Sequence, residues 1–183
     1  MKSMSPTKLE NRLQGCEAKS IRSHIEALDA CIENPSIGLP EEIFLFASSI
    51  VPLVNVDLLI RDDEGRTLLT WREDRFSGAG WHIPGGIIRY KEKIAERVAK
   101  VALTELSACL IPEPKLLAVN EFHIPGRRER AHFISFLYEC KLDGNLDGRM
   151  AHISGDPTPG QWRWFDHAPE DLLSCHRVYE QYL

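Results

Sequence analysis

The sequence lacks the features that mark membrane proteins, secreted proteins and common zinc motifs. No apolar run approaches the roughly 18 to 20 residues that a membrane span needs, and the N-terminal MKSMSPTKLENRLQG has no apolar stretch like that of a secretory signal. The five cysteines are odd in number, widely spaced and without a C-x-x-C pair, which predicts free, mostly buried thiols. We therefore expect a cytoplasmic protein without a membrane partner.

An excess of basic charge is also missing. Lys and Arg number 22 against 27 Asp and Glu, and the formal net charge of −5 argues against nucleic acid as a partner. A length of 183 residues suffices for one domain with its own core, and a hydrophobic share of 43% is ordinary for a globular protein. A small polar or nucleotide-like ligand is the partner class that this composition favours.

Hydrophobic periodicity predicts an appended N-terminal helix followed by a mixed domain. Apolar residues at three- and four-residue spacing indicate a helix within an extension of residues 1–36, and the domain then covers residues 37–183. That helical stripe consists of Ile21, Ile25, Leu28 and Ile32. Strands are expected at 54–61, 67–71, 81–83, 116–122, 132–142 and 161–165, with helices after Pro40, over 94–107 and from about 169.

Two pairs of neighbouring strands are expected to form hairpins, 54–61 with 67–71 and 116–122 with 132–142. The Gly-, Asp- and Pro-rich stretch 143–160 has no period and is expected to be an exposed loop of the kind that carries function. The order of strands, helix, strands and helix predicts an α+β fold, an α/β/α sandwich with a mixed β-sheet.

The segment Trp81–Leu110, WHIPGGIIRYKEKIAERVAKVALTELSACL, is the most informative about function. It combines a Gly-Gly turn at Gly85 and Gly86 with a following helix that carries Glu105. Glycines let a backbone approach an anionic ligand or an ion closely, and a helix can project carboxylates toward the same point. This pattern is typical of a phosphate-and-metal site.

Gly86, Glu92 and Glu105 resemble part of the Nudix box, G-x5-E-x7-R-E-U-x-E-E-x-G-U, in which U is an aliphatic residue. The resemblance implies a Nudix-type α/β/α sandwich and a magnesium-pyrophosphate site. Several box positions differ in this chain: Lys100 and Val101 replace the Arg-Glu pair, Thr104 the first of the adjacent glutamates, and Ser107 the late glycine. Two of the three main carboxylate ligands are therefore missing.

Within the Nudix superfamily the sequence is most similar to the GDP-mannose mannosyl hydrolase branch, whose box is also reduced to a lone A-E-L-G glutamate. The similarity extends over about 130 residues, from PEEIFLFASSIVPLVNVDLLI through GRTLLTWRED, GWHIPGG and AHFISFLYECKL to QWRWF. Enzymes of that branch direct water at the anomeric carbon of the sugar instead of at phosphorus. Attack at carbon needs no metal-activated water aligned with phosphorus, which offers a chemical explanation for the absence of the glutamates.

The same resemblance implies a role for several side chains and for a metal. Gly85 and Glu105 are expected to bind Mg²⁺ or Mn²⁺, Arg72 to contact the diphosphate and serve catalysis, Lys100 to supply charge near the diphosphate, Phe44 to lie beside the nucleobase, and Asp57 to be the active-site carboxylate at the sugar end. A homodimer is implied as well. Asp57 also stands out by itself, because it interrupts a strongly apolar strand and buried carboxylates are rare unless paired or functional.

Other positions of the branch have no counterpart here. Ile87 stands where the branch has an arginine directly after Gly-Gly, and Thr158 and Pro159 stand roughly where it has a glutamine ligand and a histidine base. His152, in the same loop, is our hypothesis for a substitute base. Arg127, with its neighbours in the turn IPGRRER, could either meet a phosphate or be solvated surface.

Three functions remain open on the sequence. The first is a nucleotide-sugar hydrolase that releases nucleoside diphosphate and free sugar. The second is a pyrophosphohydrolase that attacks phosphorus of a nucleoside diphosphate derivative. The third is a catalytically silent Nudix module that binds a nucleotide sugar or a partner protein.

Overall fold

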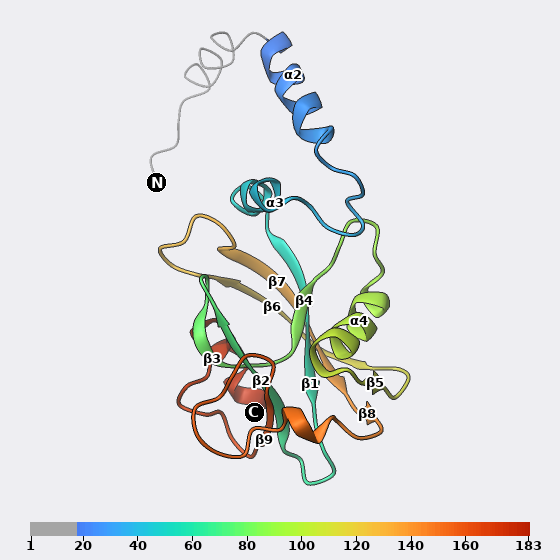
Figure 1. Ribbon diagram of the computed structural model, residues 1–183, viewed down its shortest axis with the longest axis vertical. Helices are drawn as coiled ribbons and strands as arrows, with labels where there is room; N and C mark the ends of the chain where they lie inside the picture. Colours follow the sequence, from blue (N-terminus) through green and yellow to red (C-terminus); the bar gives the residue numbers. More distant parts are fainter. Residues whose placement is uncertain (1–17) are drawn as a thin grey trace.

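The computed structural model describes residues 18–183 (Figure 1). Its helices are α2 (Ala18–Asp29), α3 (Glu41–Ser48) and α4 (Ile94–Leu106), with the 3₁₀ helices η1 (Gly148–Met150) and η2 (Ser174–Tyr182). Its strands are β1 (Leu53–Ile60), β2 (Thr67–Asp74), β3 (Gly78–His82), β4 (Gly85–Ile87), β5 (Cys109–Leu110), β6 (Lys115–His123), β7 (His132–Cys140), β8 (Leu142–Asp143) and β9 (Trp162–Phe165).

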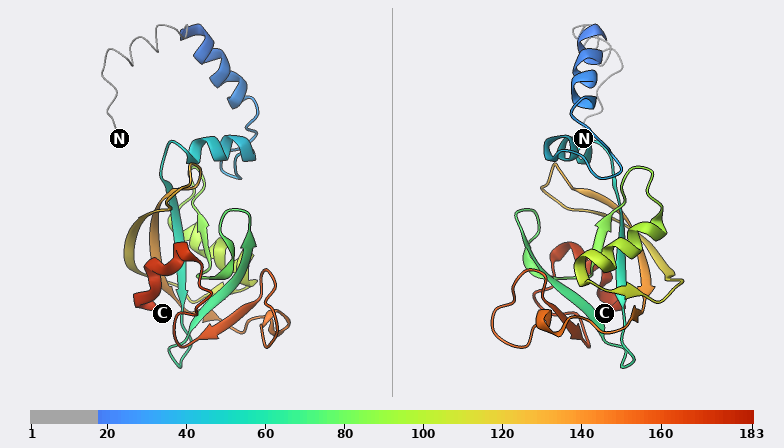
Figure 2. Two further views of the ribbon diagram at one scale, coloured as in Figure 1. Left: turned by 90° about the vertical axis from the view of Figure 1, so that its left-hand side faces the viewer. Right: turned by 45° about the vertical axis from the view of Figure 1, so that its right-hand side comes forward.

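The strands form a mixed four-stranded sheet, a three-stranded sheet and a short pair. The order of the first is β4-β1-β7-β6, in which only β1 and β7 run parallel, and the second is the antiparallel sheet β3-β2-β9. Strands β5 and β8 form the pair. Helix α4 and the C-terminal η2 lie on opposite faces of the mixed sheet (Figure 2). The predicted α+β fold, an α/β/α sandwich with a mixed sheet, is confirmed.

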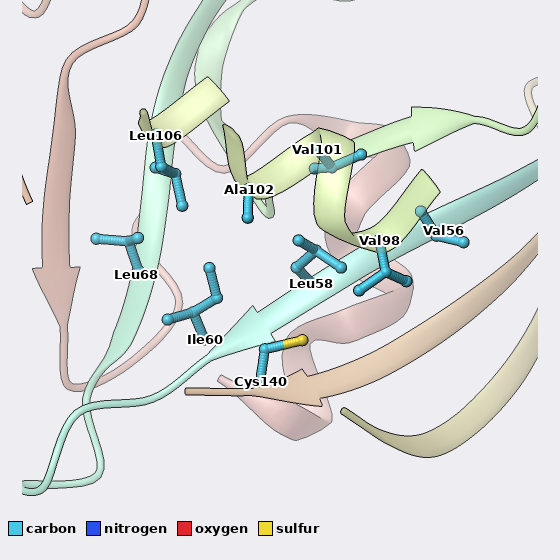
Figure 3. Packing of buried hydrophobic residues seen from close by; sticks show 9 residues of the cluster. All are labelled: Val56, Leu58, Ile60, Leu68, Val98, Val101, Ala102, Leu106 and Cys140. Carbon is cyan, nitrogen blue, oxygen red and sulfur yellow. The ribbon is translucent and has the colours of Figure 1, made fainter. Parts of the chain in front are cut away.

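The core under α4 follows from the alternation of side chains along β1. Val56, Leu58 and Ile60 point to one face and meet the apolar stripe of the helix (Figure 3). The buried members of that stripe are Val98, Val101, Ala102 and Leu106, and Ile94 packs at its edge. Leu59 points to the other face and packs against η2. The helix ends at Leu106, and the C-cap residue Ser107 has a left-handed φ of 52°.

The hairpin predicted from 54–61 and 67–71 is wrong. Strand β1 lies between β4 and β7, so both of its edges are already paired, and β2 belongs to the other sheet. A single bridge between Arg61 and Thr67 joins them. The second predicted hairpin is confirmed, since β6 and β7 pair antiparallel along their length.

Three other local predictions are corrected. Gly85 and Gly86 belong to strand β4 instead of a turn, and the helix expected from about 169 is the 3₁₀ helix η2. Cys31 and Cys109 are exposed, so the cysteines are free but not mostly buried; Cys16 lies outside the described residues. The 143–160 loop contains only η1 and the end of β8.

Helix α2 projects from the rest of the molecule (Figure 2). Its apolar residues Ile21, Ile25 and Leu28 are 38%, 59% and 43% exposed, and Ile32 lies beyond its end. Over residues 18–183, none of the helices has both the length and the apolar content that crossing a membrane requires.

Candidate active site

Asp57 and Gly85 face each other across β1 and β4. A Cβ atom on Gly85 would lie 2.1 Å from Oδ1 of Asp57, and one on Gly86 would lie 2.9 Å from Cγ2 of Val101. Neither glycine has a positive φ. The Gly-Gly pair is therefore required by the close approach of β4 to Asp57 on one side and to α4 on the other.

The carboxylate of Asp57 is held by two hydroxyl groups. Its side chain is 2% exposed, and Oδ2 accepts hydrogen bonds from Ser135 and, at 2.5 Å, from Tyr179. Burial raises the pKa of Asp57, and these hydrogen bonds oppose the rise. Ser135 comes from β7 and Tyr179 from η2, so three elements fix one carboxylate.

Glu105, near the end of α4, meets the other predicted site residues. Its Oε1 lies 3.4 Å from the Gly85 amide nitrogen and 3.7 Å from Nη2 of Arg72. Its Oε2 lies 3.4 Å from Nε2 of His82. The structure thus brings together Glu105, Arg72 and Gly85, and it adds His82, which the sequence did not single out.

Two cavities meet at Arg72 and His82. The first has a volume of about 140 Å³ and is also lined by Asp57, Gly85 and His176. The second has a volume of about 420 Å³; its lining includes Glu105, Thr104, Asp74 and Pro159. A carboxylate therefore stands on each side of the Arg72–His82 pair, Asp57 in one cavity and Glu105 in the other.

His176 is a second histidine that the sequence did not single out. Its Nδ1 accepts a hydrogen bond from the Ile83 amide at 3.3 Å. Burial lowers the pKa of His176 well below its ordinary value, and the nearby His82 and Arg72 lower it further. The ring is therefore neutral at pH 7 and carries its proton on Nε2.

Lys100 pairs with Glu92 and lines neither of the two cavities. Its Nζ lies 2.8 Å from Oε1 of Glu92. The other carboxylate oxygen of Glu92, Oε2, lies 2.7 Å from Nη2 of Arg97 and accepts a hydrogen bond from the backbone N–H of Arg89 at 2.9 Å. Burial acts to raise the pKa of Glu92, but the hydrogen bonds from Lys100, Arg89 and Arg97 outweigh it and lower the pKa to about 2. The first glutamate of the box thus joins the start of α4 to the preceding loop.

Phe44 and His152 lie away from this centre. Phe44 is half-buried and lines a third cavity of about 510 Å³ with Tyr90 and Ile87, and Ile87 also lines the cavity of Asp57. His152 packs its ring edge-on against Trp81, with centroids 5.6 Å apart, and its Nε2 lies 3.0 Å from the Gly155 carbonyl oxygen. His152 lines neither the cavity of Asp57 nor that of Glu105.

The donors around Glu105 fit a divalent cation that substrate oxygens complete. Mg²⁺ usually takes one or two protein carboxylates together with phosphate oxygens, and Glu105 supplies one. The Nε2 atom of His82 adds a nitrogen donor, which favours a transition metal. The backbone N–H of Gly85 lies within hydrogen-bonding distance of Oε1 of Glu105.

A separate group of potential metal ligands lies on the β6–β7 hairpin. Within residues 18–183, Glu121, His123 and His132 bring their ligand atoms within 4.8 Å of one another. Phe122 and Phe133, which alternate with them along the strands, line the cavity of Asp57. This group therefore faces away from that cavity.

Comparisons with known proteins agree on the fold. A family model described as NUDIX domain matches residues 51–176. The low-salt glycan biosynthesis protein Agl8 of Haloferax volcanii is 28% identical over 154 residues, which cover 82% of this chain and 92% of the relative.

Two solved structures share the architecture. A MutT NUDIX hydrolase from Burkholderia pseudomallei has a TM-score of 0.55 at 24% identity and covers 73% of this chain and 98% of its own. A MutT protein from Methanosarcina mazei has a TM-score of 0.54 at 20% identity; the match covers 73% of this chain and 94% of that protein.

Proposed function

Because the chain belongs to the NUDIX family of hydrolases, we propose that it hydrolyses a nucleotide sugar similar to GDP-mannose by water attack at the anomeric carbon. The products are a nucleoside diphosphate and a free sugar. The observation that carries this proposal is the placement of Asp57 and Glu105 in two adjoining cavities, with Arg72 and His82 between them. The similarity to a glycan biosynthesis protein supports a sugar-containing substrate.

In this proposal the diphosphate lies at Arg72, between the two cavities. Glu105 and Gly85, with His82, would hold Mg²⁺ or Mn²⁺ once phosphate oxygens complete the coordination. When bound, such an ion stabilises the negative charge of the departing diphosphate as a Lewis acid. Thr104 in place of a second glutamate leaves the ion dependent on substrate.

The sugar then lies in the cavity of Asp57. Displacement at an anomeric carbon passes through a transition state with positive charge on the sugar ring. The Asp57 carboxylate, fixed by Ser135 and Tyr179, would stabilise that charge electrostatically. His176 would donate a hydrogen bond from Nε2 to a sugar oxygen.

The nucleobase would occupy the third cavity. Phe44 and Tyr90 offer aromatic surface there, and Arg89 also lines it. Ile87 lines both this cavity and that of Asp57, so the two cavities adjoin. Lys100 would act through Glu92 instead of touching the diphosphate. The hypothesis that His152 is the base comes only from its place in the sequence, and its contacts with Trp81 and Gly155 favour a packing role instead.

We further propose that residues 37–183 form the catalytic domain and residues 1–36 an appended helical extension. The exposed apolar stripe of α2 is suited to packing against another surface. A homodimer that covers this stripe is the arrangement we expect, in the cytoplasm.

A product assay in H₂¹⁸O tests the reaction. The protein is incubated with GDP-mannose, UDP-glucose and ADP-ribose in the presence of Mg²⁺ or Mn²⁺. Free sugar and a nucleoside diphosphate without ¹⁸O are expected, because attack at carbon leaves every phosphate oxygen in place. Nucleoside monophosphate and sugar phosphate would instead establish attack at phosphorus, and saturable binding without turnover would establish a silent module.

A further inference from the structure

We propose that Arg127 and Arg130, from the turn between β6 and β7, join Arg72 in a binding site for an anionic group of the substrate. The group is a phosphate or a carboxylate held beside Asp57. This inference deepens the proposed function, because it specifies the chemistry that the cavity of about 140 Å³ accepts.

The charges around this cavity are unbalanced. All three arginines line it, and Asp57 is its one acidic residue among the residues that the structure describes. Arg72 lies 3.7 Å from Glu105 and 3.8 Å from Asp74, but within residues 18–183 no carboxylate oxygen comes within 4.0 Å of the other two guanidinium groups. A positive cavity of this kind favours an anion.

Arg130 gives the strongest indication. Its Nε is buried and has no hydrogen-bond partner, an arrangement that costs free energy unless a ligand satisfies the donor. Burial lowers the pKa of Arg130, Asp74 opposes this effect, and the neighbouring Arg72 and Arg127 lower the pKa further. An anion in the cavity would relieve both the missing hydrogen bond and the repulsion.

The two arginines are held in place before any ligand binds. Arg127 donates from Nη2 to the carbonyl oxygen of Phe76, and the Arg130 guanidinium lies 4.6 Å from the centroid of the Phe76 ring. The backbone N–H of Arg130 donates to Oγ of Ser48 at 3.0 Å, and Arg130 keeps a left-handed φ of 50°. Such a conformation persists only where surrounding contacts hold it.

The residue after Gly-Gly supplies no charge to this cavity. Ile87 directly follows Gly-Gly and presents an apolar side chain to the same cavity. Planar guanidinium groups can bind phosphate or carboxylate with two parallel hydrogen bonds. At about 140 Å³ the cavity is smaller than the neighbouring cavities of about 420 and 510 Å³, so it accepts one group of the substrate instead of the whole molecule.

Titration calorimetry with two probes tests this site without requiring turnover. Pyrophosphate and glucuronate are titrated into the wild type, Arg127→Gln/Arg130→Gln, and the control Arg128→Gln, whose side chain is exposed in the same turn. We expect the wild type and the control to bind at least one probe equally, and the double variant to bind it more than tenfold more weakly. Loss for pyrophosphate assigns the site to the diphosphate, and loss for glucuronate assigns it to an acidic sugar.

Unchanged affinity of the double variant for both probes overturns the inference, as does a wild type that binds neither. Should the double variant unfold, the single variant Arg127→Gln is used, because it leaves the Arg130–Phe76 contact in place. Its affinity for the probe is expected to fall about tenfold. Arginine-dependent binding without any sugar-nucleotide turnover would reject the proposed hydrolysis and leave this site standing.

Discussion

The Nε2 atom of His82 lies 3.4 Å from Oε2 of Glu105, and Nδ1 of the same ring lies 2.7 Å from the carbonyl oxygen of Thr70. A carbonyl oxygen can only accept, so Nδ1 carries the donated proton and Nε2 is the atom that faces the carboxylate. A neutral ring would then direct a lone pair at Glu105, which suits a cation or a proton between them. His82 thus places a potential nitrogen ligand beside Glu105, in a Nudix box that lacks two of its usual carboxylates.

Replacing His82 with Phe is expected to weaken metal binding while the fold persists. Loss of a group that ligates a metal or orients a ligand typically costs about 10- to 100-fold in metal affinity. The measurement is the Mn²⁺ concentration that gives half-maximal turnover at saturating substrate. An unchanged concentration, with a normal circular dichroism spectrum, would remove His82 from the metal site.

Glu105→Gln removes the carboxylate of the box helix with little change in shape. We expect kcat to fall about 100-fold or more, because charge stabilisation at the leaving group is lost. Glu96→Gln, an exposed position of the same helix, is the matched control and should retain the wild-type rate. Equal rates for both variants would show that the Glu105 carboxylate does not contribute to catalysis.

Gly85→Ala tests the close approach of β4 to β1. The added methyl group would lie 2.1 Å from Oδ1 of Asp57, so the carboxylate or the strand must move. Overpacking of this kind costs about 1–3 kcal/mol of unfolding free energy. Gly148→Ala, which meets nothing within 4 Å, should change stability by less than about 0.5 kcal/mol. Urea unfolding compares the two, and equal stabilities would contradict the geometry.

The Glu92 cluster predicts a specific dependence of stability on pH. Because the folded-state pKa of about 2 lies below the ordinary 4.5, ionised Glu92 stabilises the protein above pH 4.5. That contribution is lost as the pH falls from 4.5 through about 2. Glu92→Gln should therefore lower the unfolding free energy by about 1.5–3 kcal/mol at pH 7 and by progressively less toward pH 2. A deficit that is independent of pH would contradict the ionic explanation.

His152→Ala distinguishes the hypothesis for the base from a packing role. Removing a general base typically costs about 10²- to 10⁴-fold in rate. Since Nε2 lies 3.0 Å from the Gly155 carbonyl oxygen and the ring packs on Trp81, we expect a lower melting temperature and a nearly normal kcat. A rate loss of the size above, in a folded variant, would establish His152 as the base.

The sequence predicts best those features that depend on local pattern. The apolar stripe of α4 and the β6–β7 hairpin are local in the chain, and both are confirmed. The position of Glu105 follows from α4 together with the Gly-Gly pattern. The β1–β2 hairpin was wrong because β7, which pairs with β1, lies about 80 residues further along the chain, a pairing that periodicity alone does not reveal.

The rest of the site is assembled by tertiary structure alone. His82 looks like an ordinary residue of a short strand, and Tyr179 like part of a terminal helix. In the alternating pattern of β7, Ser135 falls at a buried position, but nothing in the local sequence marks it as a hydrogen-bond partner of Asp57. The arginine turn had a visible signal, its repeated basic residues, yet only the structure distinguishes Arg127, which lines the cavity, from the exposed Arg128.

The contact between Tyr179 and Asp57 also bears on how the protein matures during translation. Asp57 emerges from the ribosome early, whereas Tyr179 and His176 emerge more than 100 residues later. A nascent chain can thus pair β1, β7 and β6 before the hydrogen bonds to Asp57 are complete. Until η2 docks, the Asp57 carboxylate, which is buried in the folded protein, lacks the hydroxyl donor of Tyr179, so its hydrogen bonding is completed only after η2 has been synthesised.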